Sequence, residues 1–220
     1  MKQIIWSLLM TALFMSSLQA RELKEIKTEI LKLAESYKGQ MDLDGTKQAA
    51  LEELVDELLA EVPPLTMAEK AQRAFGVWNQ VWGPYAFDDS DRMPPGIDVD
   101  KIYQYISKDG YYYNFAEYKL LGVRLKTFLR GNYSLSDDRV QVQFNRTGLI
   151  RERGAISYLT AGEMIEQGKI KVFNFPENLP PAGVKGVLVE VYADDEMRIN
   201  YGVVGEDLSS QAIFVMKRVK

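Results

Sequence analysis

The groups that could do chemistry in this sequence are carboxylates, tyrosines, lysines and arginines, because its 220 residues include no histidine and no cysteine. Serine–histidine–aspartate and cysteine–histidine nucleophiles are therefore excluded, and so are the usual zinc sites. An enzyme built on this chain would have to work with Asp, Glu, Lys, Tyr, Ser or Arg. Without cysteine, the fold must also be stable without disulfides.

Acidic residues cluster at several points, but no cluster has the pattern of a metal or catalytic site. The segment 88–91, DDSD, resembles part of a calcium loop, yet it lacks the EF-hand spacing, the glycine and the distal glutamate. Asp194, Asp195 and Glu196 lie between two predicted strands and are most simply a turn. We therefore predict no catalytic residue, no metal site and no cofactor.

The most conspicuous chemistry is aromatic. Residues 110–118, GYYYNFAEY, place four tyrosines and one phenylalanine in nine positions. Strand side chains alternate between two faces, which here are Tyr111, Tyr113 and Phe115 on one side, and Tyr112, Ala116 and Tyr118 on the other. Both faces are largely apolar, so we expect a strand covered on both sides, with N-terminal helices over the outer one. The inner face is either ordinary core or the wall of a ligand site, and the sequence leaves both open.

The elements that position these residues begin with helices. Residues 21–38 carry an apolar stripe at three- and four-residue spacing, and residues 46–60 carry a second one that ends before Pro63-Pro64. Two helices joined by a short turn predict an antiparallel helical hairpin. Capping boxes at 66–69 and 160–163 predict a third helix through Ala74 and a helical turn that ends at Gly168.

After Gly76 the sequence has the short alternating segments of strands. The predicted strands are 77–82, 102–107, 111–118, 121–130, 139–145, 186–192, 196–201 and 211–218. Seven or eight short strands behind N-terminal helices predict a mostly β protein with α-helices, either an antiparallel barrel or a sandwich. We favour the barrel because nothing in the sequence identifies two separate sheets.

The first twenty residues have the layout of a secretory signal, with Lys2, an uncharged apolar run and a small residue at Ala20. The alternative is a short membrane anchor that stays attached. We expect cleavage after Ala20, no integral membrane segment afterwards, and a periplasmic or extracellular location. The net charge of −4 and the lack of a basic cluster argue against nucleic acid as a partner.

Several segments, taken in order, resemble the plastid lipid-associated proteins, or fibrillins. The helical lead-in, GVWNQVW, YQYISKDGYYYNFAEY, RVQVQF and VYADDEMRINYG…AIFVMKR look like successive parts of that family. They place these residues at its motif positions: Trp78, Trp82, Asn114, Glu117, Asp194, Arg198, Phe214 and Arg218. Several features depart from the family. Tyr201-Gly202 stands where Arg-Gly is usual, and VVGEDLSS intervenes before the last strand. The segment 151–170 is longer than the family pattern, and a secretory signal replaces a plastid transit sequence.

The resemblance implies a lipocalin-like antiparallel barrel that binds or organises hydrophobic small molecules or lipids without catalysis. The layout would be a signal peptide at 1–20, a helical hairpin at 21–65 packed on the barrel, and the barrel at 66–220. We expect the apolar cavity to be lined by Trp78, Trp82, Tyr113, Phe115 and Phe144. Asn114 and Arg198 are the polar residues expected to orient a ligand.

Two alternatives belong to other classes of function. In the first, the barrel is filled by its own side chains and the protein is a structural module of the cell envelope. A protein partner would then bind the outer face of the helical hairpin or the loop 83–100. In the second, a histidine-free enzyme uses Asp194 and Arg198.

Overall fold

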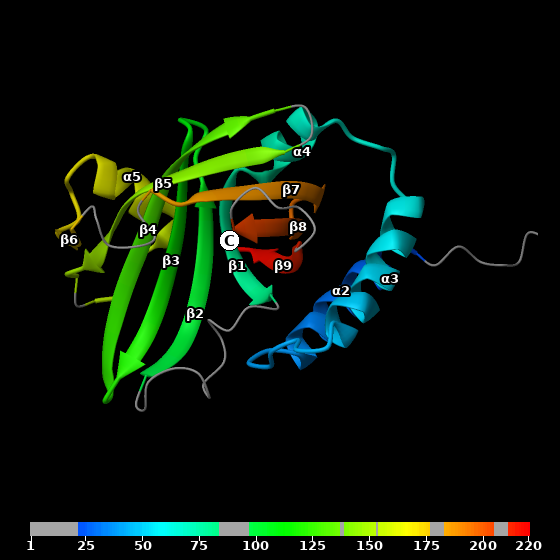
Figure 1. Ribbon diagram of the computed structural model, residues 1–220, viewed down its shortest axis with the longest axis horizontal. Coiled ribbons are helices and arrows are strands. Elements are labelled where there is room, and N and C mark those ends of the chain that lie inside the picture. The colour runs from blue at the N-terminus through cyan, green and yellow to red at the C-terminus, as the bar shows by residue number, and fades with distance from the viewer. Residues whose placement is uncertain (1–21, 84–96, 137–138, 153, 177–182, 205–210) are drawn as a thin grey trace, which may run out of the picture.

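The computed structural model describes residues 22–83, 97–136, 139–152, 154–176, 183–204 and 211–220 (Figure 1). The predicted signal peptide lies outside these residues. The elements in chain order are α2 (Leu23–Ser36), α3 (Thr46–Ala60), α4 (Met67–Ala74), β1 (Gly76–Trp82), β2 (Ile97–Ile106), β3 (Tyr111–Leu120), β4 (Val123–Leu135), β5 (Val140–Ile150), α5 (Tyr158–Glu166), β6 (Val172–Asn174), β7 (Lys185–Ala193), β8 (Met197–Val204) and β9 (Ala212–Arg218). No helix in the described part of the chain is long and apolar enough to cross a membrane.

Eight of the strands close into an antiparallel barrel. They pair in the order β1-β2-β3-β4-β5-β7-β8-β9, and β9 pairs back with β1, while β6 extends the sheet beside one end of β5. Each barrel strand therefore pairs with its neighbour along the chain, which is the up-and-down arrangement of lipocalins. The predicted lipocalin-like barrel behind N-terminal helices is confirmed.

Local sequence signals set most element boundaries. The second helix occupies the predicted residues, and α4 begins at the predicted capping box, where the Thr66 and Glu69 side chains each bind the other residue's backbone N–H. The second predicted box is wrong, because the N-cap of α5 is Ser157, three residues before the predicted cap, and Thr160 lies in the first turn of the helix. The three-residue strand β6 was not predicted.

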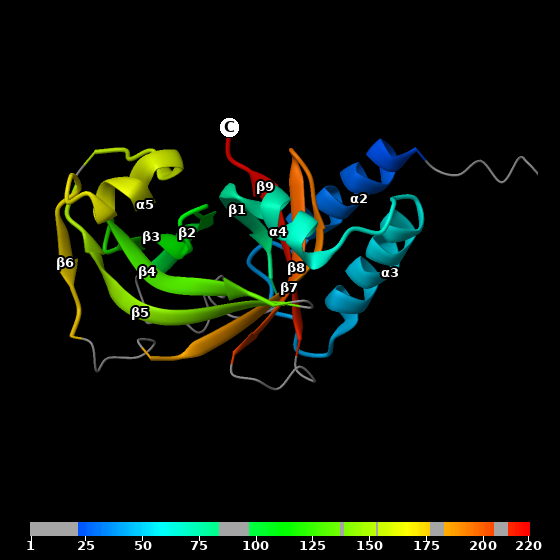
Figure 2. The same ribbon diagram turned by 90° about the horizontal axis from the view of Figure 1, so that it is seen from above.

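The helical hairpin of α2 and α3 packs on the outer face of β1, β8 and β9 (Figure 2). Apolar residues of both helices meet a buried strand surface; the group includes Ile26, Ile30, Leu51, Val55, Leu58, Val81, Trp82, Met197, Ile199, Ile213 and Val215. Lys27 of α2 also forms an ion pair with Asp194, which lies in the turn between β7 and β8; its Nζ is 2.5 Å from Oδ2 of Asp194. Burial acts to raise the pKa of Asp194, but hydrogen bonds from Lys27, the Met197 N–H and Tyr192 outweigh it and hold that pKa below its usual range.

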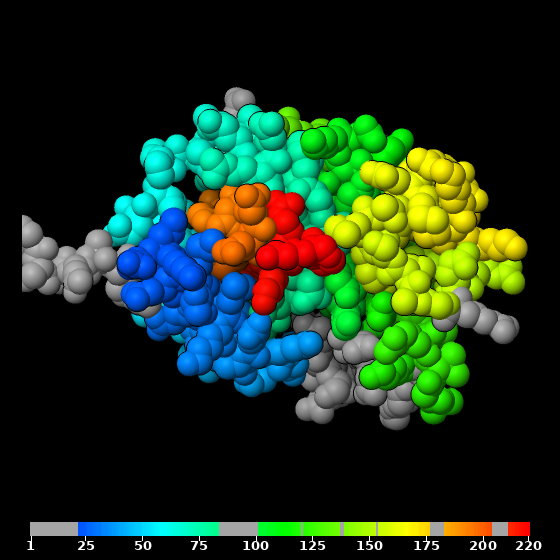
Figure 3. Space-filling model, turned by 180° about the vertical axis from the view of Figure 1, so that it is seen from behind, coloured from blue at the N-terminus to red at the C-terminus, as the bar shows by residue number. Residues whose placement is uncertain are grey.

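Helix α5 covers a different part of the barrel, the outer face of β2, β3 and β4. Its Tyr158, Ala161 and Ile165 pack against a cluster of rings from these strands. The centre of the Phe115 ring lies 5.2 Å from the centre of the Tyr113 ring and 5.0 Å from that of the Tyr158 ring. The expectation that the helical hairpin covers the tyrosine-rich strand is therefore wrong, and Figure 3 shows the hairpin and α5 on opposite sides of β9.

Helix α4 lies across one end of the barrel (Figures 1 and 2). Ala71 and Ala74 pack against inward side chains of β2, β3, β5 and β7. Arg218, near the C-terminus, donates to the carbonyl oxygens of Arg73 at 2.8 Å and Phe75 at 2.9 Å. Its guanidinium lies 4.0 Å from the centre of the Trp78 ring. The last strand therefore holds the end of α4 in place through a charge-assisted cap.

Candidate functional site

The barrel encloses a cavity of about 500 Å³. All eight barrel strands contribute to its wall, and none of the described side chains that line it carries a charge. The apolar part of the wall includes Ile102, Ala116, Leu129, Val142, Phe144, Leu188 and Phe214. A volume of this size is typical of sites that bind small molecules. The alternative in which the barrel is filled by its own side chains does not describe this interior.

Glycines on two strands make room for the rings that shape the cavity. A Cβ atom on Gly202 would lie 2.7 Å from the Phe214 ring, and one on Gly186 would lie 3.3 Å from the Phe144 ring. Both distances are shorter than comfortable carbon–carbon contacts. The Phe214 and Phe144 rings can therefore approach β8 and β7 closely because these positions have no side chain.

One region of the cavity wall is polar and built from amides. Gln104 of β2 and Asn114 of β3 are cross-strand partners on the inward face. The Tyr112 hydroxyl donates to Oδ1 of Asn114 at 3.0 Å. Burial raises the pKa of Tyr112, so this phenol stays neutral. The Oε1 atom of Gln104 accepts a hydrogen bond of 2.7 Å from Nη1 of Arg198.

Arg198 and Glu190 form a fully buried ion pair beside these amides. Nε of Arg198 donates to Oε2 of Glu190 at 2.9 Å, and Nη2 donates to Oε1. The two side chains are 0% and 1% exposed. A bidentate pair of this kind offsets the cost of removing both charges from water, and it leaves no net charge inside the barrel.

Asn200 is the unusual residue of this region. It is fully buried, and on β8 it alternates with Arg198 and Gly202 on the inward face. Its cross-strand partners are Glu190 on β7 and Phe214 on β9. Neither its amide nitrogen nor its amide oxygen has a hydrogen-bond partner among the described residues. A buried polar group without a partner costs about 1–3 kcal/mol. Asn200 is not itself part of the cavity wall, but Gly202 on the same strand and its cross-strand partner Phe214 are.

The structure brings three of the seven predicted site residues to the cavity: Asn114, Phe115 and Phe144. On the α5 side, the Phe115 ring stacks against Tyr113 and makes a tilted contact with Tyr158. Arg198 lies inside the barrel, but its guanidinium already binds Glu190 and Gln104 rather than standing free to anchor a ligand.

The remaining three lie elsewhere, which corrects their expected positions. Tyr113 faces α5, because the inward face of β3 carries the even-numbered residues. Trp82 lies under the helical hairpin, because a β-bulge between Gln80 and Trp82 reverses the alternation within β1. Trp78 is fully buried beside α4, where its Nε1 donates to the Ala74 carbonyl at 2.7 Å.

Several residues of the site were missed at the level of sequence, namely Gln80, Gln104, Glu190, Asn200 and Phe214. One signal was present. In β8 the residues Arg198 and Asn200 alternate with apolar residues, which places both on one face of the strand. That this polar face is the barrel interior follows from their complete burial, which the sequence does not display.

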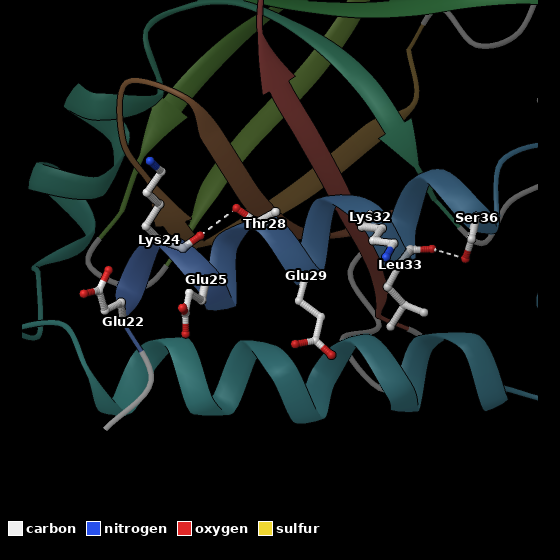
Figure 4. A pocket seen from close by; sticks show the side chains of 8 residues that line it. All are labelled: Glu22, Lys24, Glu25, Thr28, Glu29, Lys32, Leu33 and Ser36. Carbon is white, nitrogen blue, oxygen red and sulfur yellow. Dashed lines mark hydrogen bonds between the residues drawn. The ribbon is translucent and has the colours of Figure 1, made fainter. Parts of the chain in front are cut away.

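A second hollow lies on the surface of α2 (Figure 4). Its described walls come from one helix and are mainly charged; they are Glu22, Lys24, Glu25, Thr28, Glu29, Lys32, Leu33 and Ser36. The hydroxyls of Thr28 and Ser36 donate to the helix's own carbonyls, both at 2.7 Å. This is a solvated helix face. A protein partner on the outer face of the hairpin stays a prediction.

The histidine-free enzyme would need Asp194 and Arg198 to act together. Asp194 is bound by Lys27, by Tyr192 and by backbone N–H groups of its own turn on the outer side of the barrel. Arg198 points inward to Glu190. The two side chains therefore belong to separate structural networks.

Comparison with known proteins identifies the family of this chain. The sequence matches the PAP_fibrillin family model over residues 24–208. The chain belongs to the PAP_fibrillin family. No curated protein matches the sequence. Among solved structures, this PAP_fibrillin protein is similar to a streptavidin-like protein from Bacteroides eggerthii, with 10% identity and a TM-score of 0.31. That match covers 54% of this chain and 66% of the other, just under two thirds of its length.

Proposed function

We propose that this PAP_fibrillin protein binds a hydrophobic small molecule or lipid, without covalent chemistry, inside its barrel. The observation that carries the proposal is the uncharged cavity of about 500 Å³ with a largely apolar wall. Burying the apolar part of a ligand against such a wall supplies roughly 25 cal/mol for each Å² removed from water. A few polar groups then fix the ligand's orientation.

The location of this binding is part of the proposal. Residues 1–20 have the charge, apolar run and small residue of a secretory signal, which supports a role in the cell envelope or outside the cell. Measuring the N-terminal residue of the protein recovered from its host tests this part. Arg21 is the expected first residue, and a mature chain that retains residues 1–20 would contradict it.

The binding proposal is tested by the uptake of N-phenylnaphthylamine, a neutral probe whose fluorescence rises in apolar surroundings. We expect the purified protein to take up one probe molecule. Phe144→Gln should weaken uptake about tenfold or more, because burying a phenylalanine-sized contact contributes about 1.5–3 kcal/mol.

Phe173→Gln is the matched control. Phe173 is 58% exposed and lies on β6, so the same chemical change should leave uptake unaltered. Absence of uptake by the wild-type protein would refute the proposal. Equal loss in both variants would show that the probe does not occupy the barrel.

A further inference from the structure

We infer that the cavity selects a neutral amphiphile with a carbonyl oxygen in its head group, and that it discriminates against a carboxylate of the same chain length. This inference rests on the proposed binding function and specifies the ligand class of the same cavity. Three features carry it: the balanced charge inside the barrel, the orientation of two amides, and the unpartnered Asn200.

The first feature is charge. A site for a fatty acid needs a cation that is free to pair with the carboxylate, because an ionised group buried without a partner is strongly unfavourable. Arg198 is the cation that the described residues place inside the barrel beside the cavity. Glu190 already neutralises it through a bidentate contact. The described lining side chains add no other charge. A carboxylate would therefore enter a site without net positive charge.

The second feature is the direction of the amides. The oxygen of Gln104 accepts from Arg198, and the oxygen of Asn114 accepts from the Tyr112 hydroxyl. Each amide therefore has its NH₂ group left to offer to the cavity. Since the two residues are cross-strand partners, their side chains lie close enough to donate to the same ligand oxygen. Two donors without charge suit a carbonyl oxygen.

The third feature is Asn200. Its amide is buried without a partner, and both Phe214 beside it and Gly202 two residues along β8 line the cavity. Asn200 is 0% exposed, so a ligand's carbonyl oxygen would reach its NH₂ group only by displacing the side chains that separate it from the cavity. The hydrogen bond formed there would remove part of the cost of burying this amide. An alkane offers no such oxygen. Esters, ketones, quinones and amides with an apolar body share the required chemistry.

The test compares three molecules that differ in the head group: methyl dodecanoate, dodecanoate and tridecane. Each competes with N-phenylnaphthylamine for the wild-type protein at pH 8, where dodecanoate is ionised. We expect methyl dodecanoate to compete about tenfold more strongly than either of the other two. A difference of this size corresponds to about one hydrogen bond or one uncompensated desolvation.

Two variants assign the effect to residues. Asn200→Leu has a similar volume without the amide, and it should reduce the preference for the ester over tridecane. Glu190→Gln leaves the charge of Arg198 without its counterion, and it should turn the preference toward dodecanoate. If Glu190→Gln fails to fold, the comparison of ester with carboxylate on the wild-type protein still decides the question of charge.

The outcomes separate the inference from the proposed function. If neither the probe nor any of the three molecules binds, the proposed function fails, and the inference fails with it. If all three compete equally, the cavity binds apolar chains but the inferred selection is wrong. Stronger competition by dodecanoate than by its methyl ester would overturn the inference, because it would mean that Arg198 serves as a counterion for the ligand.

Discussion

The buried pair of Glu190 and Arg198 makes the sharpest prediction about stability. Both side chains are almost completely buried, at 1% and 0% exposed, and the guanidinium meets the carboxylate through two of its nitrogens. Removing one partner leaves the other charge without compensation. From the usual cost of breaking such a pair, we expect Glu190→Met or Arg198→Met to lower the free energy of unfolding by about 3–5 kcal/mol.

The double variant should behave differently. When both residues are methionine, no charge is left inside the barrel and the volume is largely filled, so we expect the double variant to be more stable than either single one. A single-variant loss of this size would lower the melting temperature by roughly 6–20 °C, because a chain of this length loses about 2–4 °C for each kcal/mol. It would also be a large share of the roughly 5–15 kcal/mol that stabilises an ordinary domain.

The assay is urea unfolding followed by tryptophan fluorescence, since Trp78 and Trp82 are both buried. The midpoint at constant slope gives each change in stability, and the four proteins form a double-mutant cycle. A second cycle on Arg130 and Glu166 is the control. Nε of Arg130 lies 3.1 Å from Oε1 of Glu166, and because this ion pair is partly exposed, its coupling energy should be only about 0.2–1 kcal/mol. Single-variant losses below about 1 kcal/mol, or a double variant equal to the sum of the singles, would refute the reasoning.

Three further predictions concern the outer parts of the barrel. Gly162→Ala should destabilise the protein by about 1–3 kcal/mol, because the added Cβ would lie 2.4 Å from the Tyr105 ring under α5. An unchanged midpoint of urea unfolding would contradict this close packing. Leu121→Asn should raise the free energy of unfolding by roughly 0.5–1 kcal/mol, since Leu121 has a positive φ of 49° in the β3–β4 turn and asparagine tolerates this conformation better than leucine. A lower melting temperature of the variant would contradict this prediction. Asp194→Asn should lower the free energy of unfolding by roughly 1–2 kcal/mol at pH 7. The difference from the wild type should disappear as the pH falls through about 4 and below, because a carboxyl with a lowered pKa in the folded state stabilises the fold only while it is ionised. A gap of the same size at pH 7 and pH 3 would contradict this role.

Local features were predictable where the signal is local. The apolar period of residues 46–60 and the box at Thr66 and Glu69 give α3 and the start of α4, because helix periodicity and capping involve only nearby residues. The hairpin around Gly110 also follows from a short turn between alternating segments. The strand pattern favoured a barrel over a sandwich only because nothing in it identified two separate sheets, and the resemblance to the fibrillins added the lipocalin-like form.

The face of each strand was harder to predict, because one extra residue reverses it. The bulge in β1 turns Trp82 outward, and a second bulge between Glu190 and Tyr192 in β7 changes the register against β8. In β3 both faces are aromatic, so hydrophobicity did not identify the inner one. That choice depends on α5, which packs on Tyr113 from about fifty residues further along the chain.

The cavity itself depends on contacts that the sequence does not display. Its space comes partly from the absence of side chains at Gly186 and Gly202, and its neutrality comes from the pairing of Glu190 with Arg198. The sequence presented Arg198 as a polar anchor for a ligand. Only the register of β7 against β8 shows that its charge is already matched.

Native mass spectrometry tests the central claim most directly. The protein is purified without detergent, and its mass is measured as isolated, after organic extraction, and after incubation of the extracted protein with methyl dodecanoate. Binding inside the barrel predicts one added molecule per chain, lost on extraction and restored by the ester. A bare mass under all three conditions would contradict ligand binding as the function of this barrel.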